Sequence, residues 1–286
     1  MKLGKDGRVS LVSFISASNL AIISHILLKL SLDDRSIINS FWWIHILQFT
    51  FLNVLIKIAF KDFIYQVSVR SILLGYTTGI GCIIGVFGER TWQSFGLYMI
   101  VLSTFHYSEF LAIAWTNPKA VSIDSFVLQH SLAYGIAAAS SWIEFIIERY
   151  YYPDLKTSTI VSYFGLFMCI GGEVLRKLAM ITASHNFNHI LQTKKSHDHQ
   201  LITHGVYQLC RHPSYVGWFY WSIGTQLILQ NPFCLLAYTI ASWRFFHDRV
   251  ILEEITLLNF FDDQYVNYQK QVGTGLPFIS GYRIDT

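Results

Sequence analysis

Residues 215–246 read YVGWFYWSIGTQLILQNPFCLLAYTIASWRFF, which is two apolar runs separated only by residues 230–232. Pro213 stands just before the first run, where proline suits the first turn of a helix because a helix does not use the N–H that proline lacks. We therefore expect the runs 215–229 and 233–246 to form a tight helical hairpin. Each run is shorter than the about 20 residues that a full membrane crossing needs, so the hairpin is expected to be tilted or shielded by other helices.

The chain before this hairpin contains further apolar runs. Of the 286 residues, 52% are hydrophobic and only 14% are charged, whereas soluble domains carry about 25% charged residues. The sequence therefore predicts an all-α polytopic integral membrane protein with about eight transmembrane helices. Besides the two hairpin runs, the expected spans are residues 9–30, 38–60, 70–88, 92–115, 125–147 and 159–183.

The lysine and arginine residues predict the orientation of these spans. With eight spans, both termini lie on one side, and of the 21 Lys and Arg residues five fall on the other side, which leaves 16 with the termini. Because cytosolic loops carry the excess of positive charge, we expect both termini and the polar segment 185–213 to be cytosolic. The five residues on the opposite side are Lys29, Arg35, Arg90, Arg149 and Lys156.

Three other function classes find little support. A net charge of +3 over 286 residues provides no basic stripe for nucleic acid. Gly75-x-x-x-Gly79 and Gly81-x-x-x-Gly85 lie inside an apolar span, where small residues allow helices to approach closely, so we do not interpret them as a dinucleotide fingerprint. His185 and the histidine four residues later would share one helical face, but no third metal ligand accompanies them, and no metal site is expected.

The polar segment 185–213 leads directly into the helix that Pro213 begins. The free N–H groups and positive dipole end of that helix suit an anionic ligand group. Tyr207, His212 and Tyr215 can hold a flat ring or a cation beside it. The alternative is a capped helix with interfacial aromatic side chains, and these residues alone do not decide between the two.

A second informative run, WRFFHDRVILEE, covers residues 243–254 at the end of the last apolar run. Arg249 and Glu253 are four residues apart and share one helical face. Ionisable groups at the edge of a membrane span are costly and often functional. The alternative interpretation is an ion pair exposed to water.

Four segments together resemble the isoprenylcysteine carboxyl methyltransferase family. They are the run RHPSYVGW at 211–218 with the hairpin behind it, residues 249–254, and the segments NFNH at 186–189 and GLPFI at 275–279. The resemblance is close from about residue 171 to 279 and rests on span count and length over the first 150 residues. The R-H-P-x-Y-x-G element alone also occurs in phospholipid methyltransferases and membrane sterol reductases, so the flanking motifs decide.

The resemblance implies methylation of the C-terminal prenylcysteine of processed CaaX proteins, farnesylated or geranylgeranylated, at the endoplasmic reticulum membrane with S-adenosylmethionine. Residues 1–158 would be N-terminal spans and 159–286 a catalytic region with a cytosolic cofactor pocket, and Arg249 would bind the substrate and act in catalysis. By similarity, the cofactor would be held by Gln192, His199, Gln200, Leu201, Ile202, Tyr207, His212, Pro213, Ser214, Tyr215 and Glu253.

The chemistry of these residues agrees with that function. A carboxylate is already ionised at pH 7, so no general base is needed to form the nucleophile. An arginine suits that carboxylate because its planar fork stays charged and can pair bidentately. The alternatives are a sterol reductase-like protein, which would need more phosphate-binding cations for NADPH, a phospholipid methyltransferase, which is usually shorter, and a transporter, which would show repeated halves with broken helices.

Overall fold

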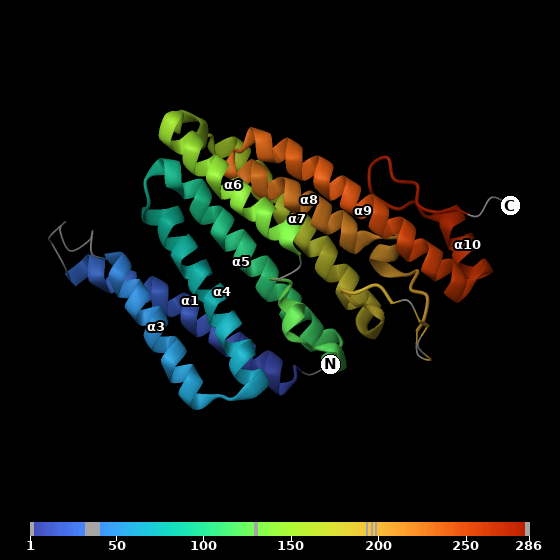
Figure 1. Ribbon diagram of the computed structural model, residues 1–286, viewed down its shortest axis with the longest axis horizontal. Helices are drawn as coiled ribbons and strands as arrows, with labels where there is room; N and C mark the ends of the chain where they lie inside the picture. Colours follow the sequence, from blue (N-terminus) through green and yellow to red (C-terminus); the bar gives the residue numbers. More distant parts are fainter. Residues whose placement is uncertain are drawn as a thin grey trace. The chain divides into compact units, whose positions relative to one another are not determined.

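The computed structural model describes residues 3–31, 41–128, 131–192, 194–195, 197 and 199–283, and these residues are almost entirely helical (Figure 1). Residues 38–40 and 129–130 of two expected spans, and Arg35 of the charge comparison, lie outside the described residues.

Eight long helices in the described residues correspond in order to the eight expected spans, so the all-α, multi-pass fold is confirmed. Helix α4 begins eight residues before the expected span, because its first two turns carry polar residues among the apolar ones. The long helices are α1 (Lys5–Ser31), α3 (Phe41–Ala59), α4 (Asp62–Phe87), α5 (Arg90–Thr116), α6 (Leu132–Tyr151), α7 (Thr159–Ala183), α8 (Pro213–Leu229) and α9 (Pro232–Phe261).

Among the described residues, three helices are long and apolar enough to cross a membrane by length and composition alone. They are α1 as far as Leu30, α4 and α5. The shorter segment Trp43–Ala59 of α3 is also apolar. The remaining connections contain short 3₁₀ helices at Pro118–Ala120, Ile123–Phe126, Pro153–Thr157, Ser184–Asn186 and Gly205–Gln208, and α10 (Asp263–Gln271) follows α9.

The chain forms two compact units, and the first comprises Met1–Gly135 with Glu148–Ser158. Within it, α4 packs against both α1 and α5. Gly75 lets α1 approach so closely that a Cβ there would lie 2.2 Å from the carbonyl oxygen of Phe14. A Cβ on Gly81 would likewise lie 2.8 Å from the carbonyl oxygen of Gly96 on α5. The expected packing role of these glycines is therefore confirmed.

The second unit comprises Ile136–Ile147 and Thr159–Thr286, and the predicted hairpin α8–α9 lies in it. Pro213 and Pro232 occupy the first turns of the two helices, and Gln230 ends α8 in the left-handed conformation. The Glu144 carboxylate of α6 accepts hydrogen bonds from the backbone N–H groups of Phe233 (2.8 Å) and Cys234 (2.7 Å). The carboxylate thus satisfies N–H groups at the start of α9 that the helix itself leaves free.

Two details of the second unit differ from simple expectation. Helix α9 does not end with its apolar run at 246 but continues unbroken to Phe261, and the segment after α10 folds back along it (Figure 1). The expectation that His185 and His189 share a helical face is wrong. The chain there is a short 3₁₀ turn followed by an irregular loop.

Candidate active site

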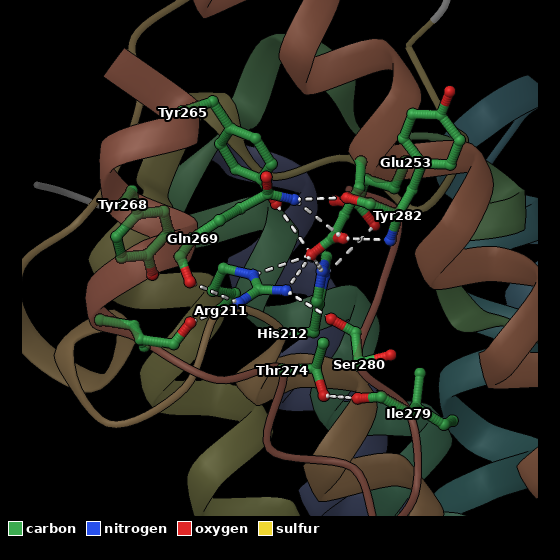
Figure 2. Close-up of polar contacts among 12 residues, drawn as sticks. Arg211, His212, Glu253, Tyr265, Tyr268, Gln269, Thr274, Ile279, Ser280 and Tyr282 are labelled. Carbon is green, nitrogen blue, oxygen red and sulfur yellow. Dashed lines mark hydrogen bonds and ion pairs between the residues drawn. The ribbon is translucent and has the colours of Figure 1, made fainter. Parts of the chain in front are cut away.

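The most deeply buried polar group near the start of α8 is the Glu254 carboxylate of α9, which is fully buried. Its Oε1 accepts hydrogen bonds from Arg211 Nε (2.8 Å), His212 Nε2 (3.1 Å) and the Tyr265 hydroxyl (3.2 Å). Its Oε2 accepts hydrogen bonds from Gln269 Nε2 (3.1 Å) and the backbone N–H of Tyr282 (2.7 Å). These partners come from the segment just before α8, from α10 and from the C-terminal tail (Figure 2). We call this set the Glu254 network.

Arg211 connects the Glu254 network to the tail of the chain. Its side chain is 1% exposed, and its Nη2 lies 2.8 Å from the Glu254 carboxylate. The same guanidinium donates to the carbonyl oxygens of Val272 and Ser280 (Figure 2). A buried ion pair is stable only when its remaining hydrogen-bonding groups are also satisfied, and here backbone carbonyls do this.

The tail approaches so closely that only glycine fits at one position. Gly281 has a φ of +83°, and a Cβ there would lie 2.0 Å from Oε2 of Glu254. Burial by itself raises the pKa of the Glu254 carboxyl, but the hydrogen bonds and charges of His212 and Arg211 outweigh burial and lower that pKa below its ordinary value. The carboxylate is therefore ionised at neutral pH.

The segment that begins α8 brings together the motif residues 212–215. His212 precedes the helix as its N-cap and Pro213 is its first residue. The rings of His212 and Tyr215 are parallel within 5°, with centroids 5.6 Å apart. The Ser214 hydroxyl accepts a hydrogen bond of 2.6 Å from Nη1 of the buried Arg176 on α7. The expected helix start at Pro213, with His212 at its N-cap, is confirmed.

Arg249 does not pair with Glu253, although the two share one side of α9. Arg249 Nε lies 3.2 Å from the Tyr215 hydroxyl, and Nη2 donates a 2.7 Å hydrogen bond to the carbonyl oxygen of His189. Among the described residues, no group hydrogen-bonds to Nη1. The interpretation of an ion pair exposed to water is therefore wrong, because Arg249 is half-buried and held by two other groups.

Glu253 lies next to the start of α8 with its side chain 30% exposed. Its Oε2 lies 3.8 Å from Nδ1 of His212, too far for a hydrogen bond. That oxygen is buried, and no described residue hydrogen-bonds to it. A buried carboxylate oxygen without a donor is costly, so this atom suits a ligand that carries hydrogen-bond donors.

The loop 199–202 packs against the end of α9 and against α10. His199 lies edge-on to the rings of Phe260 (5.6 Å) and Phe261 (5.5 Å), and burial, followed by the charge of Lys195, lowers its pKa. Leu201 and Tyr207 pack against a cluster of buried residues of α9 and α10, which consists of Leu258, Phe261, Tyr265 and Tyr268.

The remaining predicted cofactor residues are Gln200, Ile202 and Gln192. Gln200 is exposed, and its backbone N–H donates a 2.9 Å hydrogen bond to Asn186. Ile202 is half-buried. Gln192 is exposed and donates a 3.3 Å hydrogen bond to the nearby carbonyl of Ile190, so the structure does not bring it together with the residues at the start of α8.

Sequence reasoning missed the network partners of Glu254 on α10 and in the tail, namely Tyr265, Gln269 and Tyr282. Arg211 and Glu254 lie inside the motifs at 211–218 and 249–254, but the sequence alone predicts no role for either. One available signal was that both are charged and flank apolar residues, which suggests a buried pair. The contribution of the tail has no comparable local signal, because it depends on the chain folding back along α9.

These observations describe a multi-pass helical protein with a buried charged network beneath a half-buried polar surface. Residues 165–259 match the isoprenylcysteine carboxyl methyltransferase (ICMT) family. The protein-S-isoprenylcysteine O-methyltransferase of Xenopus laevis is 49% identical over 99% of this chain and 98% of its own length. The human protein of the same name is 46% identical over 99% of this chain and 96% of its own length.

The fold matches a solved structure as well. The structure of the eukaryotic intramembrane Ras methyltransferase ICMT superimposes with a TM-score of 0.95 at 48% identity, covering 98% of this chain and 100% of that chain. The chain therefore belongs to the isoprenylcysteine carboxyl methyltransferase family, as its motifs indicated. Enzymes of this family use S-adenosylmethionine as methyl donor.

Proposed function

We propose that this protein-S-isoprenylcysteine O-methyltransferase acts on processed CaaX proteins that carry farnesyl or geranylgeranyl chains, and that it does so at the endoplasmic reticulum membrane. Its active site opens toward the cytosol and its lipid substrate reaches it from the surrounding bilayer. Residues 159–286 form the catalytic region, and residues 1–158 are the N-terminal spans. The observation that carries this proposal is the arrangement of Arg249, whose Nη1 has no hydrogen-bonding partner among the described residues.

The residues near the start of α8 fit S-adenosylmethionine. The cofactor carries an ammonium group and ribose hydroxyls, which are donors suited to the unpartnered Oε2 of Glu253. Its sulfonium and adenine suit the faces of aromatic rings such as the parallel pair His212 and Tyr215. Pro213, Ser214, Tyr207 and the loop 199–202 complete the proposed pocket, and Gln192 would have to move to join it.

When bound, S-adenosylmethionine supplies an electrophilic methyl group on its sulfonium sulfur. The chain itself has three tasks: to bind the prenylcysteine carboxylate, to orient it and to exclude water. The carboxylate needs no general base, because it is ionised at neutral pH. Orientation of two reactants in an enclosed site can contribute on the order of 7–11 kcal/mol to catalysis.

Arg249 is placed to bind and orient that carboxylate. Its Nε and Nη2 are held by Tyr215 and by the carbonyl of His189, so the guanidinium is fixed before substrate arrives. The carboxylate would then be met by the Nη1 end of the fork. Both holding groups are neutral, so the guanidinium keeps its positive charge for the substrate. They also fix the plane of the guanidinium, which sets the direction from which the carboxylate must approach.

The direct test is methyl transfer from labelled S-adenosylmethionine to N-acetyl-farnesylcysteine by the purified chain in lipid nanodiscs. The farnesylated compound should gain a labelled methyl ester, which base hydrolyses. N-acetylcysteine, which lacks the farnesyl group, should not be methylated. Binding of labelled S-adenosylmethionine without any transfer to the farnesylated compound would contradict the proposal.

The orientation has its own test. Glycosylation acceptor sites placed at either terminus should remain unmodified in cells, because both termini are proposed to be cytosolic. An acceptor in the connection between α6 and α7, residues 152–158, is the matched control on the opposite side. A glycosylated C-terminus would contradict the cytosolic active site.

A further inference from the structure

One side of α9 is an exposed apolar stripe, which we define as Phe233, Leu236 and Ile240. These side chains are 78%, 64% and 60% exposed, and their spacing of three and four residues places them on one face of the helix. In an intramembrane protein such a face contacts lipid. Trp243 follows on the same face, and the charged and exposed Arg244 comes next. Because tryptophan is enriched where a membrane meets water, the stripe reaches the membrane surface near Trp243.

The C-terminal tail returns to this point. Trp243 Nε1 donates a 2.8 Å hydrogen bond to the carbonyl oxygen of Pro277, and Figure 1 shows the segment after α10 lying along α9. Leu276 and Ile279 are each 5% exposed and pack into a core cluster that includes Phe246 and Val250 of α9. We call residues 276–279 the tail tip.

Phe278 projects from the tail tip in an unusual way. It is 97% exposed, although both apolar neighbours, Leu276 and Ile279, are buried. Its φ is +60°, a left-handed conformation that is a genuine outlier for a bulky residue. Such strain persists only where the surrounding structure imposes it, and it clusters at functional positions.

The tail tip is firmly held. The Thr274 hydroxyl donates to the carbonyl of Ile279 (Figure 2), and the N–H of Ile279 lies 3.4 Å from the carbonyl oxygen of Leu276. The backbone on both sides of Phe278 is thus fixed, and the side chain is displayed outward by the fold.

We propose that the tail tip is a membrane-surface anchor, in which Phe278 enters the headgroup layer of the phospholipid bilayer beside Trp243. The anchor continues the lipid-facing stripe of α9 in space, although more than thirty residues separate them in the sequence. The bilayer supplies the apolar surroundings that the exposed ring lacks within the protein.

The anchor has a consequence for the Glu254 network. Ser280 and Tyr282, which bond to Arg211 and Glu254, follow the tail tip within four residues of Phe278. Membrane contact at the tip therefore helps to keep the tail closed over the buried carboxylate. Extraction from lipid should loosen the tail before it disturbs the membrane helices.

The test uses the full chain in nanodiscs, with an environment-sensitive fluorophore attached at Phe278→Cys and, as matched control, at Ser280→Cys. Three native cysteines are buried and Cys82 is half-buried, so the wild-type chain gives the labelling background. We expect brominated phospholipid to quench the probe at 278 and to leave the probe at 280 unquenched. Equal and weak quenching at both positions would overturn the proposal.

Two substitutions separate lipid contact from backbone strain. Asp tolerates a left-handed φ better than Leu, so a merely strained surface position would be more stable with Phe278→Asp than with Phe278→Leu. A membrane anchor predicts the reverse order of thermal midpoints in nanodiscs, because Leu remains apolar and Asp does not. The order with Asp more stable would overturn the proposal even if both variants fold.

Discussion

Two neighbouring carboxylates on α9 have opposite surroundings. Glu254 is fully buried and accepts hydrogen bonds from five groups of the segment before α8, of α10 and of the tail. Glu253, one residue earlier, is partly exposed, and one of its oxygens is buried without a donor among the described residues. A helix turns by about 100° per residue, so consecutive residues face different groups. The satisfied side of α9 is suited to hold the fold together, and the other side is suited to bind ligands.

The largest expected effect is at Glu254. Glu254→Gln keeps the size of the side chain but leaves the buried Arg211 without its counter-charge, and breaking a buried pair in this way costs about 3–5 kcal/mol. We expect a strongly lowered thermal midpoint in nanodiscs, measured by intrinsic fluorescence. Glu253→Gln, measured in parallel, is the matched control and should unfold near the wild-type midpoint. Equal midpoints for the two variants would remove the distinction between the two sides of α9.

The next largest effect is expected at Arg249. Removing one partner of a desolvated charge pair costs about 2–5 kcal/mol, so Arg249→Ala should lower kcat/KM for the farnesylcysteine substrate by roughly 100-fold, or about 2.7 kcal/mol. Arg249→Lys keeps the charge without the fork and should recover only part of the activity. Affinity for S-adenosylmethionine should be unchanged in both.

Arg244→Ala is the control for Arg249, because Arg244 is exposed on the same helix. This variant should retain near wild-type turnover. If Arg249→Ala turned over normally, the carboxylate would have to be held elsewhere, and the buried Arg176 beside Ser214 would be the next position to substitute.

A smaller effect is expected at Tyr215, which positions Arg249 through its hydroxyl group. A hydrogen bond to a charged group contributes about 1.5–3 kcal/mol, so Tyr215→Phe should lower kcat/KM about tenfold while keeping the ring parallel to His212. In an Arg249→Ala background the same change should have almost no further effect, because the group that Tyr215 positions is gone. Additive losses in this double-mutant cycle would show that Tyr215 acts independently of Arg249.

The smallest expected effect is a change of the thermal midpoint at acidic pH. The pKa of Glu254 is lower in the folded chain than its ordinary value, so its stabilising contribution is fully present above the unfolded pKa of about 4.3 and is lost as the pH falls through the folded pKa. The difference in thermal midpoint between wild type and Glu254→Gln should therefore shrink below about pH 4. A difference that stays constant down to the acid limit of the assay would contradict an ionised Glu254.

The sequence predicts the helices well and the buried network poorly, for a physical reason. Apolar run length determines a membrane helix locally, so the hairpin around residues 230–232 and the helix start at Pro213 were both predictable. Glycine spacing likewise predicted the close approach of α4 to its neighbours. These features depend on residues a few positions apart.

The Glu254 network depends on residues far apart in the sequence, because Arg211 lies 43 positions from Glu254 and 69 positions from Ser280. Nothing in the sequence near Tyr282 or Gly281 indicates that the tail returns to α9. The two adjacent glutamates are also identical in type, and their different roles follow from which way each faces on the helix. The cofactor role of Glu253 remains a prediction that only a binding measurement can decide.

That measurement is the affinity of the full chain for S-adenosylmethionine in nanodiscs, compared between wild type and Glu253→Gln, together with the thermal midpoint without cofactor. If the unpartnered Oε2 binds the donor groups of the cofactor, the dissociation constant should rise about tenfold, equal to about 1.4 kcal/mol, while the midpoint stays at the wild-type value. An unchanged dissociation constant, or a loss of affinity that only accompanies unfolding, would contradict the account.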